Sequence, residues 1–160
     1  MRKDLIVMSA DGTKIVVGVD GSPSSRAALR WAVRQAVLTG ETLDAVMAWQ
    51  FPRILRTSAW APIYVDEAAG LEEDARRALD AVISDEVAPA DRQLVTARVV
   101  QGDPTQVLRE AAASAGLLVL GSRGHGSLAD ALLGSVGQYC VHHAHCPVLV
   151  MRGQPHRAAA

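Results

Sequence analysis

Aromatic residues and cysteines are both scarce in this sequence. Phenylalanine, tryptophan and tyrosine together make up 4% of the 160 residues, so the core must be built from aliphatic side chains, as in a buried parallel sheet. The cysteines, Cys140 and Cys146, are too few for a disulfide framework, and we expect free thiols. This composition excludes a small disulfide-stapled fold and favours one aliphatic domain.

Long apolar runs and an excess of charge are also missing. No apolar stretch approaches the ~20 residues that a membrane helix needs, because the runs at 43–49 and 117–120 are no longer than strands. The run at 5–8 follows Asp4 and is too short for a secretory signal. A formal net charge of −1 gives no electrostatic reason to bind nucleic acid or an anionic membrane. We therefore expect a cytoplasmic protein with neither as a partner.

Three common nucleotide and hydrolase motifs are absent or incomplete. There is no Gly-Lys pair, which excludes the P-loop of ordinary ATPases. There is no Gly-x-Ser-x-Gly segment, which argues against a serine hydrolase. Gly124, Gly126 and Ala129 match the spacing of a dinucleotide fingerprint, but the acidic residue expected about twenty positions later is missing. We treat this last match as accidental.

Strand-like and helix-like segments alternate along the chain, which indicates an α/β domain with a mostly parallel sheet. Ser22 and Pro23 predict the cap and first position of the first helix, and Gly40 predicts its end. Residues 51–66 contain two prolines and show no regular spacing of apolar residues, which predicts a loop that could fold over a site. We expect strands at 14–19, 42–49, 94–100, 117–120 and 148–151, a long helix at 66–87, an N-terminal extension at 1–13, a domain at 14–152 and a disordered tail at 153–160.

The most informative motif follows the predicted strand at 117–120. Gly121 and Gly124 allow the backbone to turn tightly and to approach a ligand, with amide N–H groups available for an anion. Arg123 adds a cation between them. Gly134 and Ser135 open a predicted helix, whose N-terminus attracts phosphate. The spacing predicts two halves of one phosphate-binding site.

This pattern, Gly-x2-Gly-x9-Gly-Ser, resembles the ATP-binding signature of the universal stress protein family. The resemblance covers most of the chain. Residues 14–22 (Lys-Ile-Val-Val-Gly-Val-Asp-Gly-Ser) are similar to the first strand of the family and the acidic residue after it, and residues 147–151 are similar to its last strand. Gly102, Asp103 and Pro104 provide a match between them. Several matches in one order are more specific than one glycine motif.

The resemblance implies a single-domain, open, twisted parallel sheet of five strands in the order 3-2-1-4-5, with helices on both faces, of the adenine nucleotide alpha hydrolase-like class. In such sheets a ligand binds beyond the carboxyl ends of the strands, where the strand order reverses. This order brings Asp20 and Gly121 together. By resemblance, Asp20 meets the ribose or base, and the main chain of Ala48 meets adenine. The expected nucleotide-binding residues are Gly18, Val19, Asp20, Ala48, Leu120, Gly121, Ser122, Arg123, Gly124, Gly134, Ser135 and Val136.

Several of these residues also have simpler interpretations. Asp20 can serve an ordinary Asp-Gly turn, and the glycines can serve only to adopt positive φ. Arg123 can be a solvated charge, and Ser135 can be the N-cap of a helix that begins at Val136. These alternatives stay open at this point.

Histidines and cysteines near the C-terminal end invite a metal or catalytic interpretation. No carboxylate can be placed beside His125 from the sequence, so we do not expect it to be catalytic. The cluster at 140–146 contains the ligand types of a zinc site. It runs from a predicted helix end into the turn before Pro147, so its members cannot all converge, and we expect no metal site.

The resemblance implies an ATP-binding protein, with or without Mg²⁺, that acts as a nucleotide-dependent stress-response or signalling module. We expect slow turnover at most, because no general base, no pair of magnesium-binding carboxylates and no phosphate-contacting lysine is evident. Two alternatives stay open: a slow ATPase or autophosphorylating enzyme with Ser122, Ser135 or a nearby threonine as acceptor, and a protein-interaction module without nucleotide. The resemblance also implies a homodimer joined through strand 148–151, an apolar edge that needs covering. The sequence does not specify the stress, the downstream partner or the nucleotide bound in the cell.

Overall fold

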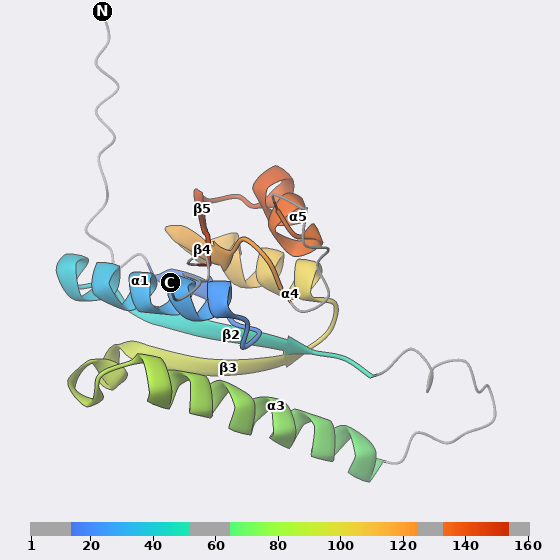
Figure 1. Cartoon of the computed structure of the whole chain (residues 1–160). Coiled ribbons are helices and arrows are strands. Elements are labelled where there is room, and N and C mark those ends of the chain that lie inside the picture. The colour runs from blue at the N-terminus through green and yellow to red at the C-terminus, as the bar shows by residue number, and fades with distance from the viewer. Residues whose placement is uncertain (1–13, 52–64, 125–132, 154–160) are drawn as a thin grey trace, which may run out of the picture.

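The computed structural model describes residues 14–51, 65–124 and 133–153. They form one parallel five-stranded sheet in the order β3-β2-β1-β4-β5 (Figure 1), which confirms the expected order. The expected extension at 1–13, nearly all of the loop at 51–66 and the tail from 154 lie outside the described residues. The strands are β1 (Ile15–Gly18), β2 (Leu43–Trp49), β3 (Val95–Gln101), β4 (Leu117–Gly121) and β5 (Val148–Met151). The helices are α1 (Pro23–Thr39), α3 (Val65–Glu86), α4 (Pro104–Ala111) and α5 (Ser135–His143), with 3-10 helices η1 (Pro89–Leu94) and η2 (Ala112–Ser114).

Helix α1 begins and ends where the local sequence predicts. Ser22 is its N-cap and accepts a hydrogen bond from Ser25 N (3.3 Å), and Pro23 occupies the first helical position. At the other end Gly40 has φ 74° and donates its N–H to Ala36 O (2.9 Å). This left-handed conformation favours glycine. Because Ser22 follows β1 so closely, the start of α1 lies at the carboxyl end of the sheet.

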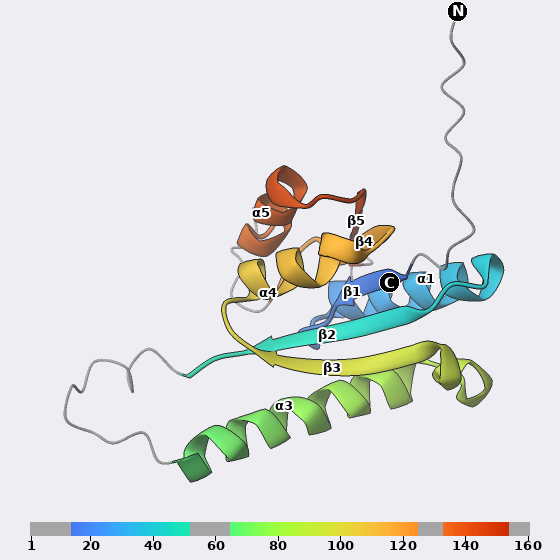
Figure 2. The ribbon, with the colours of Figure 1, turned by 180° about the vertical axis from the view of Figure 1, so that it is seen from behind.

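Helices cover both faces of the sheet (Figure 2), as expected. Alternate residues of a strand face opposite sides. In β1, Ile15 and Val17 join the core cluster that contains α1 and α3, whereas Val16 joins the cluster that contains α4 and α5. Each fully buried aliphatic side chain contributes about 1.5–3 kcal/mol, so this aliphatic packing dominates the stability despite the scarcity of aromatic residues.

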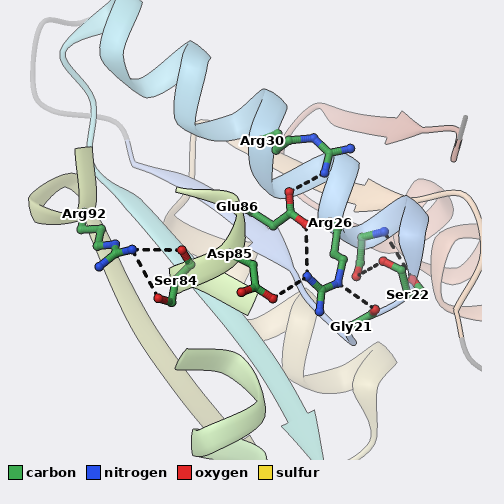
Figure 3. A network of polar contacts seen from close by, with 9 residues as sticks. Gly21, Ser22, Arg26, Arg30, Ser84, Asp85, Glu86 and Arg92 are labelled. Atoms are coloured by element: carbon green, nitrogen blue, oxygen red, sulfur yellow. Dashed lines mark hydrogen bonds and ion pairs between the residues drawn. The ribbon is translucent and has the colours of Figure 1, made fainter. Parts of the chain in front are cut away.

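A polar network joins the end of α3 to the start of α1 (Figure 3). Arg26 Nη1 donates to Asp85 Oδ2 (3.2 Å) and to Glu86 Oε1 (3.1 Å), and Arg30 Nη1 donates to Glu86 Oε2 (2.5 Å). These hydrogen bonds, which Arg26 donates to Glu86 and Asp85, raise the pKa of its guanidinium. Arg26 Nε also donates to the carbonyl oxygen of Gly21 (3.3 Å). The network therefore anchors the turn that follows β1.

Candidate functional site

A cavity of about 540 Å³ opens at the carboxyl ends of β1, β2 and β4, beside the first turns of α4 and α5. Because β1 pairs with both β2 and β4, the strand order reverses here. Cavities of ~300–1,000 Å³ are typical of small-molecule sites. The lining residues are Gly18, Val19, Asp20, Ser25, Val46, Ala48, Pro104, Leu108, Leu120, Gly121, Arg123, Gly124, Leu133, Gly134, Ser135, Val136 and Gly137. This set contains every residue expected from the sequence except Ser122.

Ser122 lies behind the cavity wall rather than on it. It is buried, its N–H donates to Met151 O (2.7 Å), and its carbonyl oxygen accepts a hydrogen bond from Gly134 N (2.8 Å). Its main chain therefore connects the loop after β4 to β5 and to the start of α5. The two glycine segments, ten residues apart in sequence between Gly124 and Gly134, are held together by this residue.

Gly121, at the end of β4, and Gly124 and Gly134 in the chain that follows do not adopt positive φ. Gly121 and Gly124 instead allow neighbouring atoms to approach closely. The positive-φ glycines of the described residues are Gly21, Gly40 and Gly102, so the positive-φ interpretation is wrong for Gly121, Gly124 and Gly134. An ideal Cβ at Gly121 would lie 2.5 Å from Ser24 Oγ. An ideal Cβ at Gly124 would lie 2.6 Å from Asp20 Oδ2. Both contacts are shorter than real Cβ atoms make. A larger residue at position 121 would also meet the backbone of Ser24 and Ser25 and displace the loop, whereas one at position 124 would displace the loop or the Asp20 carboxylate.

Asp20 combines the turn role and the site role. Its Oδ1 accepts a hydrogen bond from Ser22 N (2.9 Å), as in an Asx turn, and Gly21 between them has φ 82°. The residue is nevertheless exposed and lines the cavity. Ser25 Oγ accepts a hydrogen bond from Asp20 N (3.3 Å) and donates to Ser22 O (3.0 Å). The local turn thus fixes a carboxylate at the mouth of the cavity.

Helix α5 begins one residue earlier than the sequence predicts. Gly134 is the N-cap, with φ −68° and ψ 164°, and Ser135 is the first helical residue, so the prediction of Ser135 as N-cap is wrong. Glycine needs no side-chain bond to occupy this position. The hydrogen bond from Gln138 N to Gly134 O (3.0 Å) opens the helix. The N–H groups of Ser135, Val136 and Gly137 precede this bond and have no carbonyl acceptor within α5. All three residues line the cavity.

The opposite wall of the cavity is apolar. Val46 and Ala48 lie on the same face of β2, Leu120 is the residue before the last in β4, and Leu108 comes from α4. At Gly18 an ideal Cβ would lie 2.8 Å from Leu120 Cδ2 and 3.0 Å from Leu108 Cδ1. Glycine at this position therefore lets the two leucines close against the sheet. One side of the cavity suits a flat apolar group and the other an anion.

Sequence reasoning missed six lining residues: Ser25, Val46, Pro104, Leu108, Leu133 and Gly137. Val46 could have been found, because two-residue periodicity places it on the same face of its strand as Ala48. Leu108 gave no such signal. Its position in the wall depends on how α4 packs on β2, which a local pattern does not determine.

The histidines and cysteines near the C-terminal end do not form a metal site within the described residues. In that part of the chain no three His, Cys, Asp or Glu residues gather closely enough to hold a metal ion. Cys140 and Cys146 are free thiols, as expected. Burial raises the pKa of the Cys140 thiol to about 11. His125 lies outside the described residues. Among the helices described, none has both the length and the apolar character needed to span a bilayer.

Comparison with known proteins agrees with this geometry. Residues 12–152 match the model of the universal stress protein family. A universal stress protein of Mycobacterium tuberculosis is 36% identical over 171 residues, which cover 94% of this chain and 52% of that protein. The chain thus spans about half the length of the curated relatives it matches.

Solved structures of similar proteins have the same fold. A universal stress protein from Lactobacillus plantarum aligns with a TM-score of 0.63 and 27% identity, over 88% of this chain and 98% of that one. A universal stress protein solved in complex with cAMP aligns with a TM-score of 0.55 and 26% identity, over 89% of this chain and 98% of that one.

Proposed function

Because the chain belongs to the universal stress protein family, we propose that it binds ATP in the cavity beside β1 and β4 and acts as a nucleotide-dependent stress-response or signalling module. The observation that carries the proposal is the division of this cavity. An apolar wall faces a wall built from Arg123, the loop glycines and the first turn of α5. The similar protein solved with cAMP supports an adenine nucleotide as the ligand class.

The proposed arrangement follows the chemistry of the walls. The adenine base packs on the apolar wall near Val46, Ala48 and Leu108. Asp20 accepts hydrogen bonds from the ribose hydroxyls. The phosphates lie against the loop glycines and the N-terminus of α5, where backbone amides and the helix dipole favour negative charge. Arg123 is exposed on the same wall and adds a full positive charge.

Binding rather than rapid turnover suits the described lining residues. Asp20 is the carboxylate among them, and its Oδ1 already accepts a hydrogen bond from Ser22 N. Neither lysine nor histidine lines the described walls. Asp20 with the phosphates could hold Mg²⁺, which keeps several waters and usually needs few protein carboxylates. We propose ATP as the ligand with or without this ion.

Calorimetric titration of ATP, with and without Mg²⁺, tests this function. The wild type is compared with Asp20→Ala and Gly124→Asp, and Gly70→Asp is the matched control because a Cβ at Gly70 meets nothing within 4 Å. We expect the wild type and the control to bind, and both site variants to bind at least about tenfold more weakly. Equal binding by all four proteins, or none by the wild type, would refute the proposal.

A homodimer through β5 is part of the proposal. β5 is an edge strand, and its four residues are all only half-buried. An apolar edge of this kind pairs readily with another chain. We expect sedimentation to show a dimer for the wild type and a monomer for Val150→Lys. A monomeric wild type at micromolar concentration would contradict this assembly.

A further inference from the structure

Ser24 is a buried hydroxyl outside the cavity that the proposed ligand contacts do not use. It is the second residue of α1 and is only 5% exposed. A buried hydroxyl is costly unless it is hydrogen-bonded, so its partners indicate what it stabilises.

Both partners of the Ser24 hydroxyl belong to Arg123, 99 residues further along the chain. Ser24 Oγ donates to Arg123 O (2.5 Å) and accepts from Arg123 N (3.3 Å). Ser22 Oγ donates to the same carbonyl oxygen (3.1 Å). The start of α1 thereby holds the main chain of Arg123 on both sides of its Cα atom.

The contact extends to the beginning of the same loop. An ideal Cβ at Gly121 would lie 2.5 Å from Ser24 Oγ and 2.7 Å from the Ser24 carbonyl carbon. The loop therefore lies directly against Ser24 at two points, Gly121 and Arg123. Arg123 and Gly124 form the cavity wall on the other side of this contact.

We propose that Ser24 is a positioning residue for phosphate binding. It fixes the Arg123 main chain, and with it the Gly124 backbone and the point from which the Arg123 side chain extends, in the position that meets the phosphates. This inference rests on the proposed function. Without Ser24 the loop would have to be ordered when the phosphates bind, which lowers affinity. The apolar wall is built from Val46 and Ala48 of β2, Leu120 of β4 and Leu108 of α4. The Ser24 hydroxyl bonds Arg123 and none of these residues, so the base contacts should be unaffected.

Comparing ATP with adenosine in Ser24→Ala separates positioning from a general structural role. NMR titration measures both ligands, including weak binding. We expect the ATP dissociation constant to rise about tenfold while that of adenosine changes less than about twofold, because adenosine lacks phosphates. The control is Ser84→Ala, in α3. The Ser84 hydroxyl accepts a hydrogen bond from Arg92 Nη2 (3.3 Å) and does not hydrogen-bond the described residues of the loop after β4, so its removal should change neither dissociation constant.

A measurement without nucleotide tests the same contact independently. The Arg123 amide should exchange with solvent faster in Ser24→Ala than in the wild type, because it loses its acceptor. If Ser24→Ala does not fold, Ser24→Cys carries the comparison with a side chain of similar shape and weaker hydrogen bonding.

The outcomes distinguish this inference from the function on which it rests. Wild-type protein that fails to bind ATP would overturn both. If the wild type binds ATP but Ser24→Ala binds it with the same affinity, the positioning role alone is overturned. The same holds if Ser24→Ala loses equal affinity for ATP and for adenosine. Selective loss for ATP with faster Arg123 exchange would establish it.

Discussion

Gly124 lies so close to Asp20 that a side chain at position 124 would require the Asp20 carboxylate or the loop to shift. An ideal Cβ at position 124 would be 2.6 Å from Asp20 Oδ2, whereas real Cβ contacts are essentially never below 3.0 Å. This contact joins the loop after β4 to the turn after β1, and both line the cavity. A single methyl group at position 124 therefore probes both halves of the proposed site.

We expect Gly124→Ala to weaken ATP binding by about tenfold or more, because either the loop or Asp20 must move. Both residues are exposed, so the thermal midpoint should change little. Calorimetry and thermal unfolding on the same sample check this pair of expectations. Unchanged affinity would show that the Asp20 to Gly124 contact is irrelevant to the ligand.

Gly70 provides the opposite case. It lies within α3, is exposed, and a Cβ built there meets nothing within 4 Å. Gly70→Ala should stabilise the protein by about 0.5–1 kcal/mol, because alanine loses less backbone entropy in a helix. Denaturant unfolding measures the change, and ATP affinity should stay at the wild-type value. A loss of stability would mean that position 70 is constrained by contacts beyond α3.

Glu86 should make the protein sensitive to acid. Burial raises the pKa of this carboxyl, but the hydrogen bonds from Arg30 and Arg26 outweigh burial and the pKa lies below its usual value. A lowered folded-state pKa stabilises the fold above the ordinary glutamate pKa, and this stability is lost as the pH falls through the folded-state value. Glu86→Gln should therefore cost roughly 1–3 kcal/mol at neutral pH.

Urea unfolding at several pH values checks the Glu86 prediction. The difference between wild type and Glu86→Gln should shrink as the pH falls below the range in which the carboxyl is ionised. Asp74→Asn, on the exposed face of α3, is the control and should show almost no difference at any pH. A constant difference down to strongly acidic pH would show that packing, not charge, explains the effect.

Cys140 should resist thiol reagents in the folded protein. Its side chain lies on the fully buried face of α5, packed in the core cluster that contains Leu108 and Leu118, and burial raises its pKa to about 11. In a Cys146→Ala background, alkylation of Cys140 should occur at the rate of unfolding rather than at the rate of a free thiol. Because the pKa of Cys140 is higher in the folded protein than in the unfolded chain, its neutral thiol favours folding at all pH values below the ordinary thiol pKa. The free energy of unfolding should fall as the pH rises from that value toward 11, because the unfolded chain then loses the proton first. Rapid alkylation at neutral pH would contradict this burial.

Local sequence patterns determined the elements of this fold. The apolar runs of β1 and β2 follow from burial on both faces of the sheet. Ser22, Pro23 and Gly40 mark the ends of α1 through backbone geometry and hydrogen bonds within a few residues. The glycine-rich loop was predicted from the spacing of its residues, whereas the strand order came from the family resemblance, and the sheet confirms that order. The ends of α1, the buried strands and the glycine loop could be predicted because each depends on neighbouring residues or on the spacing of one motif.

Only the tertiary structure decided how these elements contact one another. Asp44 in the apolar β2 is stabilised by Lys14 (2.9 Å) and Arg98 (3.1 Å), which come from outside its own strand. Leu108 reaches the cavity because α4 packs on β2, and Ser24 holds Arg123 across 99 residues. The sequence by itself determined that a glycine-rich loop follows a buried strand at Gly121. The packing of α1 against that loop determined its shape, because hydrogen bonds between distant residues exist only once the sheet has brought them together.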